Sequence, residues 1–193
     1  MEDHLPTDVQ VHPTAIVDSD EVGAGTRIWA YVHVMEGAVI GRDCKVGDHA
    51  YIEGGATLGD RVTIKNGSMI WHGVSIGNDV FVGPGVVFTN DLFPRVRYQT
   101  GPTDWIATVV EDRVSIGANC TIVCGIRIGA NSMIGAGSVV TADVDDHALM
   151  TGDPARRTGW ACDCGRPLSD ELGCGSCGRR YAQGPGGLKE IES

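Results

Sequence analysis

Aliphatic residues, and once a phenylalanine, recur at every sixth position along most of this chain. A period of six fits neither an α-helix, which repeats about every 3.6 residues, nor a lone half-buried strand, which repeats about every two. Internal repeats of this kind are typical of solenoids built from stacked short strands. The nineteen positions are Ile16, Val22, Ile28, Val34, Ile40, Val46, Ile52, Leu58, Ile64, Ile70, Ile76, Val82 and Phe88, then Val110, Ile116, Ile122, Ile128, Ile134 and Val140.

The residue two positions before each of these is usually small or β-branched, as at Ala38 and Ala56. Because residues i and i+2 of a strand lie on the same face, each hexapeptide predicts one small and one large side chain in a narrow interior. Glycine directly follows nine of the nineteen positions. We expect the glycines to supply the positive φ angles of the tight turns between strands.

The repeat resembles the hexapeptide-repeat family of left-handed parallel β-helices. The resemblance implies that three hexapeptides form one triangular coil of eighteen residues, so that nineteen repeats give about six coils. It also implies the left-handed sense, which ordinary crossover rules would not predict. We therefore predict an all-β fold, a left-handed parallel β-helix, over residues 1–160.

The register breaks at residues 89–108, because Phe88 and Val110 are 22 residues apart and 22 is not a multiple of six. A loop must leave the coil here, and long loops on rigid scaffolds are usually functional. Residues 148–160 have lost the period and are expected to leave the solenoid. Residues 161–193 form a small cysteine-rich, zinc-ribbon-like appendage, with a flexible Gly-Pro-Gly-Gly tail from Gly184.

Composition excludes several classes of protein. The net charge of −10 disfavours nucleic-acid binding. No apolar stretch approaches the length that spans a membrane, so we expect no membrane partner. The chain starts without a visible signal peptide and contains seven cysteines, which predicts a reducing compartment and a cytoplasmic location.

Seven segments are similar to one branch of the hexapeptide acyltransferases, the N-acetyltransferases of nucleotide-linked 3-amino sugars. They are residues 12–17, 64–67, 71–74, 87–95, 115–125, 134–141 and 152–156. The runs Phe-Thr-Asn-Asp-Leu-Phe-Pro-Arg and Gly-Ala-Asn-Cys-Thr-Ile-Val-Cys-Gly are the most specific. The resemblance implies a homotrimer with active sites between neighbouring solenoids. It also implies acetyl-CoA as co-substrate and, as acceptor, the 3-amino group of a dTDP- or UDP-linked amino sugar.

Two residues are candidates for the chemistry. Asn90 matches the family's asparagine at the start of the loop and is expected to orient the amine or the carbonyl. With eighteen residues per coil, His72 stacks beneath Asn90 at about 4.8 Å. A histidine near neutral pH can serve as a general base. Since this position is more often acidic in the relatives, the catalytic role of His72 is a hypothesis.

The substrate pocket is expected around the same loop. Asn66 matches a polar position of the family's sugar pocket, and Arg95 matches a Pro-Arg pair that binds phosphate or fixes the loop. The eighteen-residue columns place Trp71 beside Glu53 and His33 beneath Tyr51. The predicted substrate-binding set is Asn66, Trp71, Arg95, Glu53 and His33.

Acetyl-CoA needs amide contacts and positive charge in an otherwise acidic chain. Backbone N–H groups at Ala118 and Ala136 are expected to hold the pantetheine amides. Arg127 and Arg156, in the last coils and the exit segment, are the predicted phosphate contacts.

The appendage contains two cysteine pairs, Cys162-Asp-Cys164 and Cys174-Gly-Ser-Cys177, each followed by glycine. Four thiolates suit a closed tetrahedral structural Zn²⁺ site. A piece of this size has too little core to fold unaided, which favours a metal. The alternative is four reduced free thiols, because the first pair is one residue shorter than usual zinc knuckles.

Other functions remain open at this stage. An O-acetyltransferase is the nearest rival, because a hydroxyl acceptor needs a base such as His72 more than an amine does. A scaffold that only recruits partners is a second alternative, and acetyl-CoA binding would separate it from an enzyme. A zinc hydratase is disfavoured, because no two histidines of the coils share a column.

Overall fold

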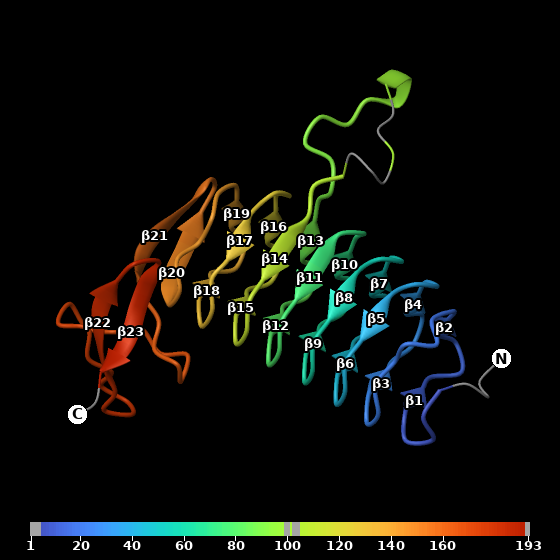
Figure 1. The fold of residues 1–193 in the computed structure, drawn as a ribbon, viewed down its shortest axis with the longest axis horizontal. Coiled ribbons are helices and arrows are strands. Elements are labelled where there is room, and N and C mark those ends of the chain that lie inside the picture. Colours follow the sequence, from blue (N-terminus) through green and yellow to red (C-terminus); the bar gives the residue numbers. More distant parts are fainter. Residues whose placement is uncertain (1–4, 99–100, 102–104, 192–193) are drawn as a thin grey trace.

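The computed structural model describes residues 5–98, 101 and 105–191 as a β-solenoid with one short 3-10 helix, η1 (Val96–Tyr98), and a small C-terminal hairpin (Figure 1). Its short strands stack into three parallel sheets, here named faces A, B and C. The chain visits them in the order A, B, C, and the three connections are named corners AB, BC and CA. The predicted hexapeptide-repeat β-helix is confirmed.

The strand bounds follow the repeat. Face A contains β1 (Gln10–Val11), β3 (Arg27–Ile28), β6 (Lys45–Val46), β9 (Thr63–Ile64), β12 (Phe81–Val82), β15 (Ser115–Ile116), β18 (Met133–Ile134), β20 (Ala148–Gly152) and the antiparallel β21 (Ala155–Trp160). Face B contains β2 (Ile16–Val17), β4 (His33–Val34), β7 (Tyr51–Ile52), β10 (Met69–Ile70), β13 (Val87–Phe88), β16 (Thr121–Ile122) and β19 (Val139–Val140). Face C contains β5 (Val39–Ile40), β8 (Thr57–Leu58), β11 (Val74–Ile76), β14 (Thr108–Val110) and β17 (Arg127–Ile128).

The interior consists of the predicted small and large pairs. Ala38 and Ile40 are 0% and 2% exposed, for example, and the same holds for Ala56 and Leu58 at 0% and 3%. Strands of neighbouring coils pair eighteen residues apart, as Ile52 does with Ile70. Among the described residues, Phe88 is the one aromatic that is fully buried in the solenoid, and it lies just before the loop leaves.

The glycines that follow the aliphatic positions have a different role from the predicted one. Their φ angles are not positive; the positive φ values lie two residues further on, at residues such as Asp43, His49 and Arg61. A Cβ added at any of the nine glycines would lie within 3.0 Å of a residue of the adjacent coil, as at Gly41, 2.5 Å from the Gly59 carbonyl carbon. They are therefore required by the close approach of stacked turns rather than by backbone conformation.

The two ends of the solenoid depart from the period. The first coil is one residue short, because Val17 pairs with Val34. Val17 therefore occupies the place expected for Ile16, which is 54% exposed, so the prediction that Ile16 faces inward is wrong. At the other end β20 still pairs in parallel with β18, so residues 148–152 continue the solenoid, contrary to expectation.

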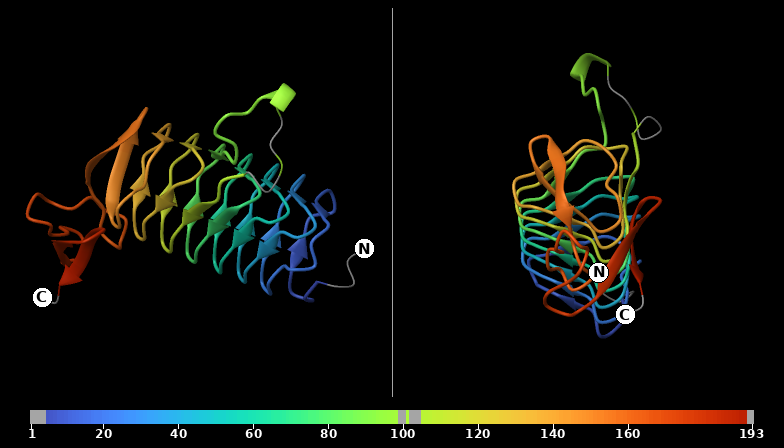
Figure 2. Two further views of the ribbon diagram at one scale, coloured as in Figure 1. Left: turned by 45° about the horizontal axis from the view of Figure 1, so that its top comes forward. Right: turned by 90° about the vertical axis from the view of Figure 1, so that its left-hand side faces the viewer.

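The solenoid is longer than predicted, with eight stacked parallel strands on face A instead of about six coils. The appendage ends in a hairpin of β22 (Arg180–Gly184) and β23 (Gly187–Ile191), so the expected flexible tail from Gly184 is wrong up to Ile191. The hairpin lies against the C-terminal end of the solenoid (Figure 2). Within the described ranges, no helix is long and apolar enough to cross a membrane.

Candidate active site

The loop leaves the solenoid at corner BC, immediately after β13. Strand β14 pairs with β11 so that Val74 lies opposite Thr108, 34 residues apart rather than eighteen, which leaves sixteen extra residues for the loop. Asn90 closes the base of the loop, since its carbonyl oxygen accepts a hydrogen bond from the Ile106 amide at 3.0 Å. The loop then rises well clear of the coils (Figures 1 and 2).

His72 lies at the same corner, one coil earlier, and is held by three neighbours. Its backbone N–H donates to Glu53 Oε2 at 2.8 Å, and its Nδ1 lies 2.8 Å from the Gly54 carbonyl oxygen. Because a carbonyl can only accept, Nδ1 carries the hydrogen and Nε2 of the neutral ring keeps its lone pair. Trp105 returns from the loop to pack edge-on against the imidazole, with ring centroids 5.4 Å apart.

The chain beneath His72 has no room for a side chain. Gly55 adopts a φ of +84°, and a Cβ there would lie 2.5 Å from the Cε1 atom of His72. The position of the imidazole therefore depends on two consecutive glycines, Gly54 and Gly55, in the preceding coil.

A row of aromatic rings extends from this corner along face B. The Trp71 ring lies 5.3 Å from Tyr51, and Tyr51 lies 5.6 Å from His33. His33 Nε2 is 3.0 Å from Asp18 Oδ2, which fixes the far end of the row. The predicted residues Trp71 and His33 are thus linked through Tyr51. The structure brings Glu53, Trp71, His72 and Asn90 to one corner, and it places Arg95 further out on the exposed part of the loop.

Asn66 lies elsewhere. It follows β9 and therefore occupies corner AB, where it is exposed and lines a groove of about 360 Å³ together with Trp29, Lys45 and Lys65. Within one chain, Asn66 and His72 are on different edges of the solenoid.

Ala118 and Ala136 share corner AB with Asn66, in later coils. Neither amide N–H has a hydrogen-bond acceptor within the described residues. Each amide nitrogen packs over a glycine of the preceding coil, since a Cβ at Gly83 would lie 2.7 Å from the Ala118 nitrogen and a Cβ at Gly117 would lie 2.5 Å from the Ala136 nitrogen. Arg156 is nearby: it pairs with Thr151 on β20, and Thr151 lies over Gly135 beside Ala136. Ala118, Ala136 and the exposed Arg156 therefore lie along corner AB.

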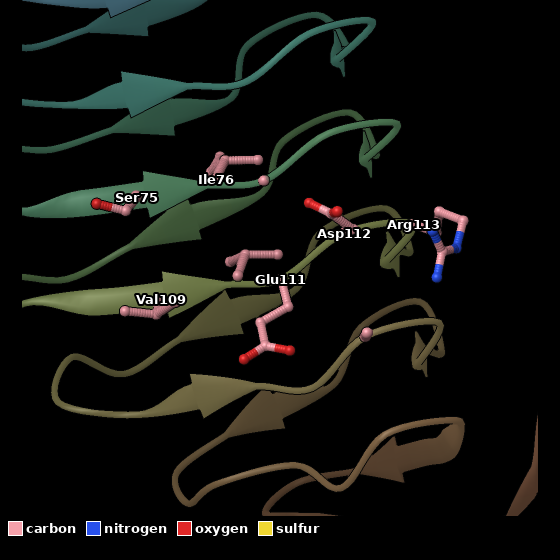
Figure 3. Close-up of a pocket in the computed structure, with 9 residues that line it drawn as sticks. Ser75, Ile76, Val109, Glu111, Asp112 and Arg113 are labelled. Atoms are coloured by element: carbon pink, nitrogen blue, oxygen red, sulfur yellow. The ribbon is translucent and has the colours of Figure 1, made fainter. Parts of the chain in front are cut away.

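Arg127 has a different environment. It projects from face C and donates to Glu111 at 2.6 and 2.8 Å and to Asp146 at 2.7 Å. These hydrogen bonds, the one to Glu111 first, raise the pKa of the guanidinium further above its high usual value. Glu111 also borders an open groove of about 430 Å³ that contains Asp112 and Arg113 (Figure 3). The charge of Arg127 is thus already balanced within the chain.

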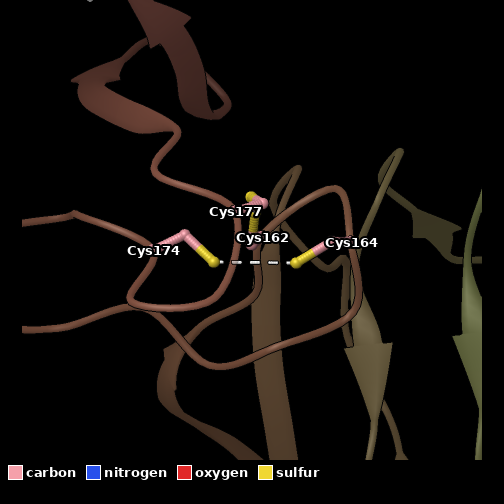
Figure 4. A group of neighbouring side chains, drawn as sticks. All are labelled: Cys162, Cys164, Cys174 and Cys177. Atoms are coloured by element: carbon pink, nitrogen blue, oxygen red, sulfur yellow. Dashed lines mark hydrogen bonds between the residues drawn. The ribbon is translucent and has the colours of Figure 1, made fainter.

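The two cysteine pairs of the appendage, which nine residues separate in the sequence, come together in space (Figure 4). Their sulfur atoms all lie within 4.8 Å of one another, so this cluster is where a metal could be held. Cys44 and Cys120 occupy small inward positions of the solenoid, and burial raises the pKa of both thiols.

Sequence reasoning missed two contributors to the His72 corner. Trp105 gave no signal, because the loop has no period from which its position could be read. Tyr51 was recognised only as the neighbour of His33, although its place in the column between His33 and Met69 could have identified it as the link to Trp71.

Residues 21–54 and 55–90 match the family described as bacterial transferase hexapeptide (six repeats), and residues 107–142 match the hexapeptide repeat of succinyl-transferase. The chain is 50% identical over 183 residues to the dTDP-3-amino-3,6-dideoxy-alpha-D-galactopyranose 3-N-acetyltransferase of Aneurinibacillus thermoaerophilus, and the match covers 94% of each chain.

Two solved structures share the fold at low sequence identity. One is a point mutant of AntD, an N-acyltransferase from Bacillus cereus in complex with dTDP and coenzyme A, with a TM-score of 0.53 and 18% identity over 79% of this chain and 82% of that chain. The other is the UDP-N-acetylglucosamine acyltransferase of Francisella novicida, with a TM-score of 0.51 and 16% identity over 81% of this chain and 70% of that chain.

Proposed function

Because the chain belongs to the family of bacterial hexapeptide-repeat transferases, we propose that it transfers the acetyl group of acetyl-CoA to the 3-amino group of a dTDP-linked 3-amino sugar. The observation that carries this proposal is the 50% identity, over 94% of both chains, to an enzyme whose name states that reaction on a 3-amino-3,6-dideoxygalactose. The seven unpaired cysteines fit a reducing compartment, so we place the enzyme in the cytoplasm.

In the proposed reaction the sugar nitrogen forms a bond to the thioester carbonyl carbon, the carbon–sulfur bond breaks, and the CoA thiolate leaves. The nitrogen must lose a proton during this step. Nε2 of His72 is the acceptor, because Nδ1 is committed to Gly54. Asn90, above His72 at the base of the loop, orients the amine or the carbonyl. Glu53 holds the backbone of His72 and borders the sugar.

Acetyl-CoA is proposed to lie along corner AB. The amides of Ala118 and Ala136, which have no acceptor among the described residues, would donate to the pantetheine carbonyls, and Arg156 would contact a phosphate next to them. Arg127 lies away from corner AB and stabilises face C and corner CA through Glu111 and Asp146 instead of binding phosphate directly.

The nucleotide sugar is proposed to lie against the aromatic row of Trp71, Tyr51 and His33. Aromatic faces suit a sugar or a pyrimidine ring. Arg95 of the loop and Asn66 of corner AB complete this pocket, with Arg95 on the diphosphate.

These two sets of residues lie on different corners of one chain, which supports a homotrimer as the active form. In a ring of three solenoids, corner AB of one copy can meet corner BC of the next, and each interface then holds one complete site. The loop fits this role, because Phe93 and Val96 on it are 82% and 91% exposed, an unusual state for large apolar side chains unless they pack against another copy.

The experiment that tests the function is mass spectrometry of products from acetyl-CoA and a panel of dTDP- and UDP-linked amino sugars. A gain of one acetyl group on a dTDP-linked 3-amino sugar supports the proposal, and a gain only on UDP-linked sugars corrects the carrier. The His72 geometry also favours the rival O-acetyltransferase, so hydroxyl acceptors belong in the panel. If the protein does not bind acetyl-CoA, the enzyme proposal is wrong and the remaining alternative is a non-catalytic scaffold.

A further inference from the structure

The C-terminal appendage has very little apolar interior of its own. Its core cluster consists of the buried residues Cys162, Cys174, Tyr181 and Leu188, with Trp160, Leu168 and Leu172 packed around them. A core of this size does not hold a chain of about thirty residues in one conformation, and small domains of this kind use disulfides or metals instead.

The cysteine sulfurs are spaced for a metal and not for disulfides. Cys162 and Cys177 are 3.5 Å apart at Sγ, and Cys164 and Cys174 are 3.6 Å apart. Four sulfurs at about 2.3 Å from one Zn²⁺ in a tetrahedron lie roughly 3.8 Å from each other. A disulfide requires about 2.05 Å.

The backbone turns the two pairs toward each other. In the first pair the Gly165 amide donates to the Cys162 carbonyl at 2.8 Å, and in the second the Gly178 amide donates to the Cys174 carbonyl at 3.0 Å. Both glycines adopt a positive φ, 79° and 78°, which reverses the chain directly after the second cysteine of each pair.

The groups around the sulfurs suit thiolates. The Tyr181 hydroxyl accepts a hydrogen bond from the Asp163 amide at 3.0 Å, so its own hydrogen is available for Cys162 Sγ, 3.2 Å away. On the other side Arg179 Nη1 lies 3.6 Å from Cys177 Sγ. One hydroxyl donor and one cation thus face sulfur atoms that would carry negative charge.

From this arrangement we infer that Cys162, Cys164, Cys174 and Cys177 bind one structural Zn²⁺ as four thiolates. All four tetrahedral positions are filled by protein sulfur, so no site remains for a substrate. The metal is thus separate from the acetyl-transfer chemistry.

The site is tied to the last coil of the solenoid. Tyr181 packs on His147 with ring centroids 5.0 Å apart, and His147 donates from Nδ1 to the Ala161 carbonyl at 2.9 Å. The Gly187 backbone forms a bridge with Asp146, where a Cβ would lie within 3.0 Å of the Asp146 backbone. Zinc therefore orders a cap that covers the C-terminal end of the β-helix.

The first test is metal analysis of the full-length protein purified without chelators. One zinc per chain, in mass spectra of the native protein as well as by elemental analysis, is expected. Zinc well below half an equivalent, a chain mass lowered by disulfide formation, or stoichiometric iron instead of zinc would each overturn the inference. Because the readout is metal content, it does not depend on the proposed enzymatic activity.

Variants then assign the ligands. Cys174→Ser should lose at least tenfold in zinc affinity, whereas Cys44→Ala, a buried cysteine of the solenoid, should retain one zinc. Co²⁺ exchanged into the wild type should give the visible absorption bands of a tetrahedral tetrathiolate site. Bands of an octahedral oxygen site, or an unchanged zinc affinity in Cys174→Ser, would refute the assignment.

Discussion

His72 donates its Nδ1 hydrogen to the carbonyl oxygen of Gly54, 2.8 Å away in the preceding coil. This single contact selects the tautomer of the ring, so that Nε2 is the nitrogen able to accept a proton. The same corner receives the base of the loop, with Asn90 above and Trp105 against the ring.

Replacing His72 by asparagine should lower kcat/KM for the amino sugar by more than tenfold, about 1.4 kcal/mol of barrier, because no basic nitrogen remains at the site. Steady-state kinetics with acetyl-CoA saturating measures this. The matched control is His49→Asn, since His49 stacks on Tyr31 at corner AB and has no proposed role. A loss below tenfold in His72→Asn would end the assignment of His72 as base.

Gly55→Ala should reduce activity more than Gly67→Ala does. Both glycines have positive φ, +84° and +68°, so both variants carry a similar backbone cost. Only at Gly55 would the new Cβ meet the His72 ring, whereas at Gly67 nothing lies within 4 Å. Equal activity of the two variants would contradict a catalytic dependence on the His72 position.

Trp105→Ala should lower kcat/KM several-fold, and Trp105→Phe should recover most of it, because the edge-on packing against His72 needs an aromatic ring. Thermal stability should change little, since Trp105 belongs to the loop. If both variants lose the same activity, the ring contact is not what matters at this position.

The two predicted phosphate contacts should behave differently. Arg156→Gln is expected to raise the KM for acetyl-CoA several-fold at unchanged Tm. Arg127→Gln leaves Glu111 and Asp146 without their partner and should lower stability by roughly 1 kcal/mol, a figure already reduced for the partial exposure of these groups. An unchanged KM in Arg156→Gln would remove Arg156 from acetyl-CoA binding, and a raised KM in Arg127→Gln would contradict a purely structural role for Arg127.

Ser132→Ala should stabilise the protein, whereas Ser68→Ala should destabilise it. Both hydroxyls are buried at small inward positions, but Ser68 donates to the Gly83 carbonyl at 2.8 Å, and Ser132 has no partner in the part of the chain that the structure describes. Each substitution is expected to change the free energy of unfolding by about 1 kcal/mol, upward for Ser132→Ala and downward for Ser68→Ala, as measured by denaturant unfolding. If both substitutions changed the free energy of unfolding in the same direction, the difference between the paired Ser68 hydroxyl and the unpaired Ser132 hydroxyl would not explain their stability.

The fold was predictable because its rule is local: a six-residue period fixes which side chain faces inward in every coil. The period predicted the wrong inward residue at Ile16, where the coil is one residue shorter. It also gave no sign of β20, which continues the solenoid although the sequence has lost the period. The turn glycines were misread because contact between stacked coils, such as Gly41 against Gly59, is not visible in a single hexapeptide. The eighteen-residue columns predicted that His72 lies beneath Asn90 and that Trp71 lies beside Glu53. The position of Trp105 was not predictable, because it depends on the path of a loop that has no repeat.

The separation of Asn66 on corner AB from His72 on corner BC has a genetic consequence. If each site is shared between copies, a chain defective at Asn66 and a chain defective at His72 are both inactive alone but complementary together. Coexpression of the two should restore about a quarter of the sites in a random mixture of trimers. Two variants of the same corner should restore none, so a complementation table would assign each residue to its edge of the β-helix.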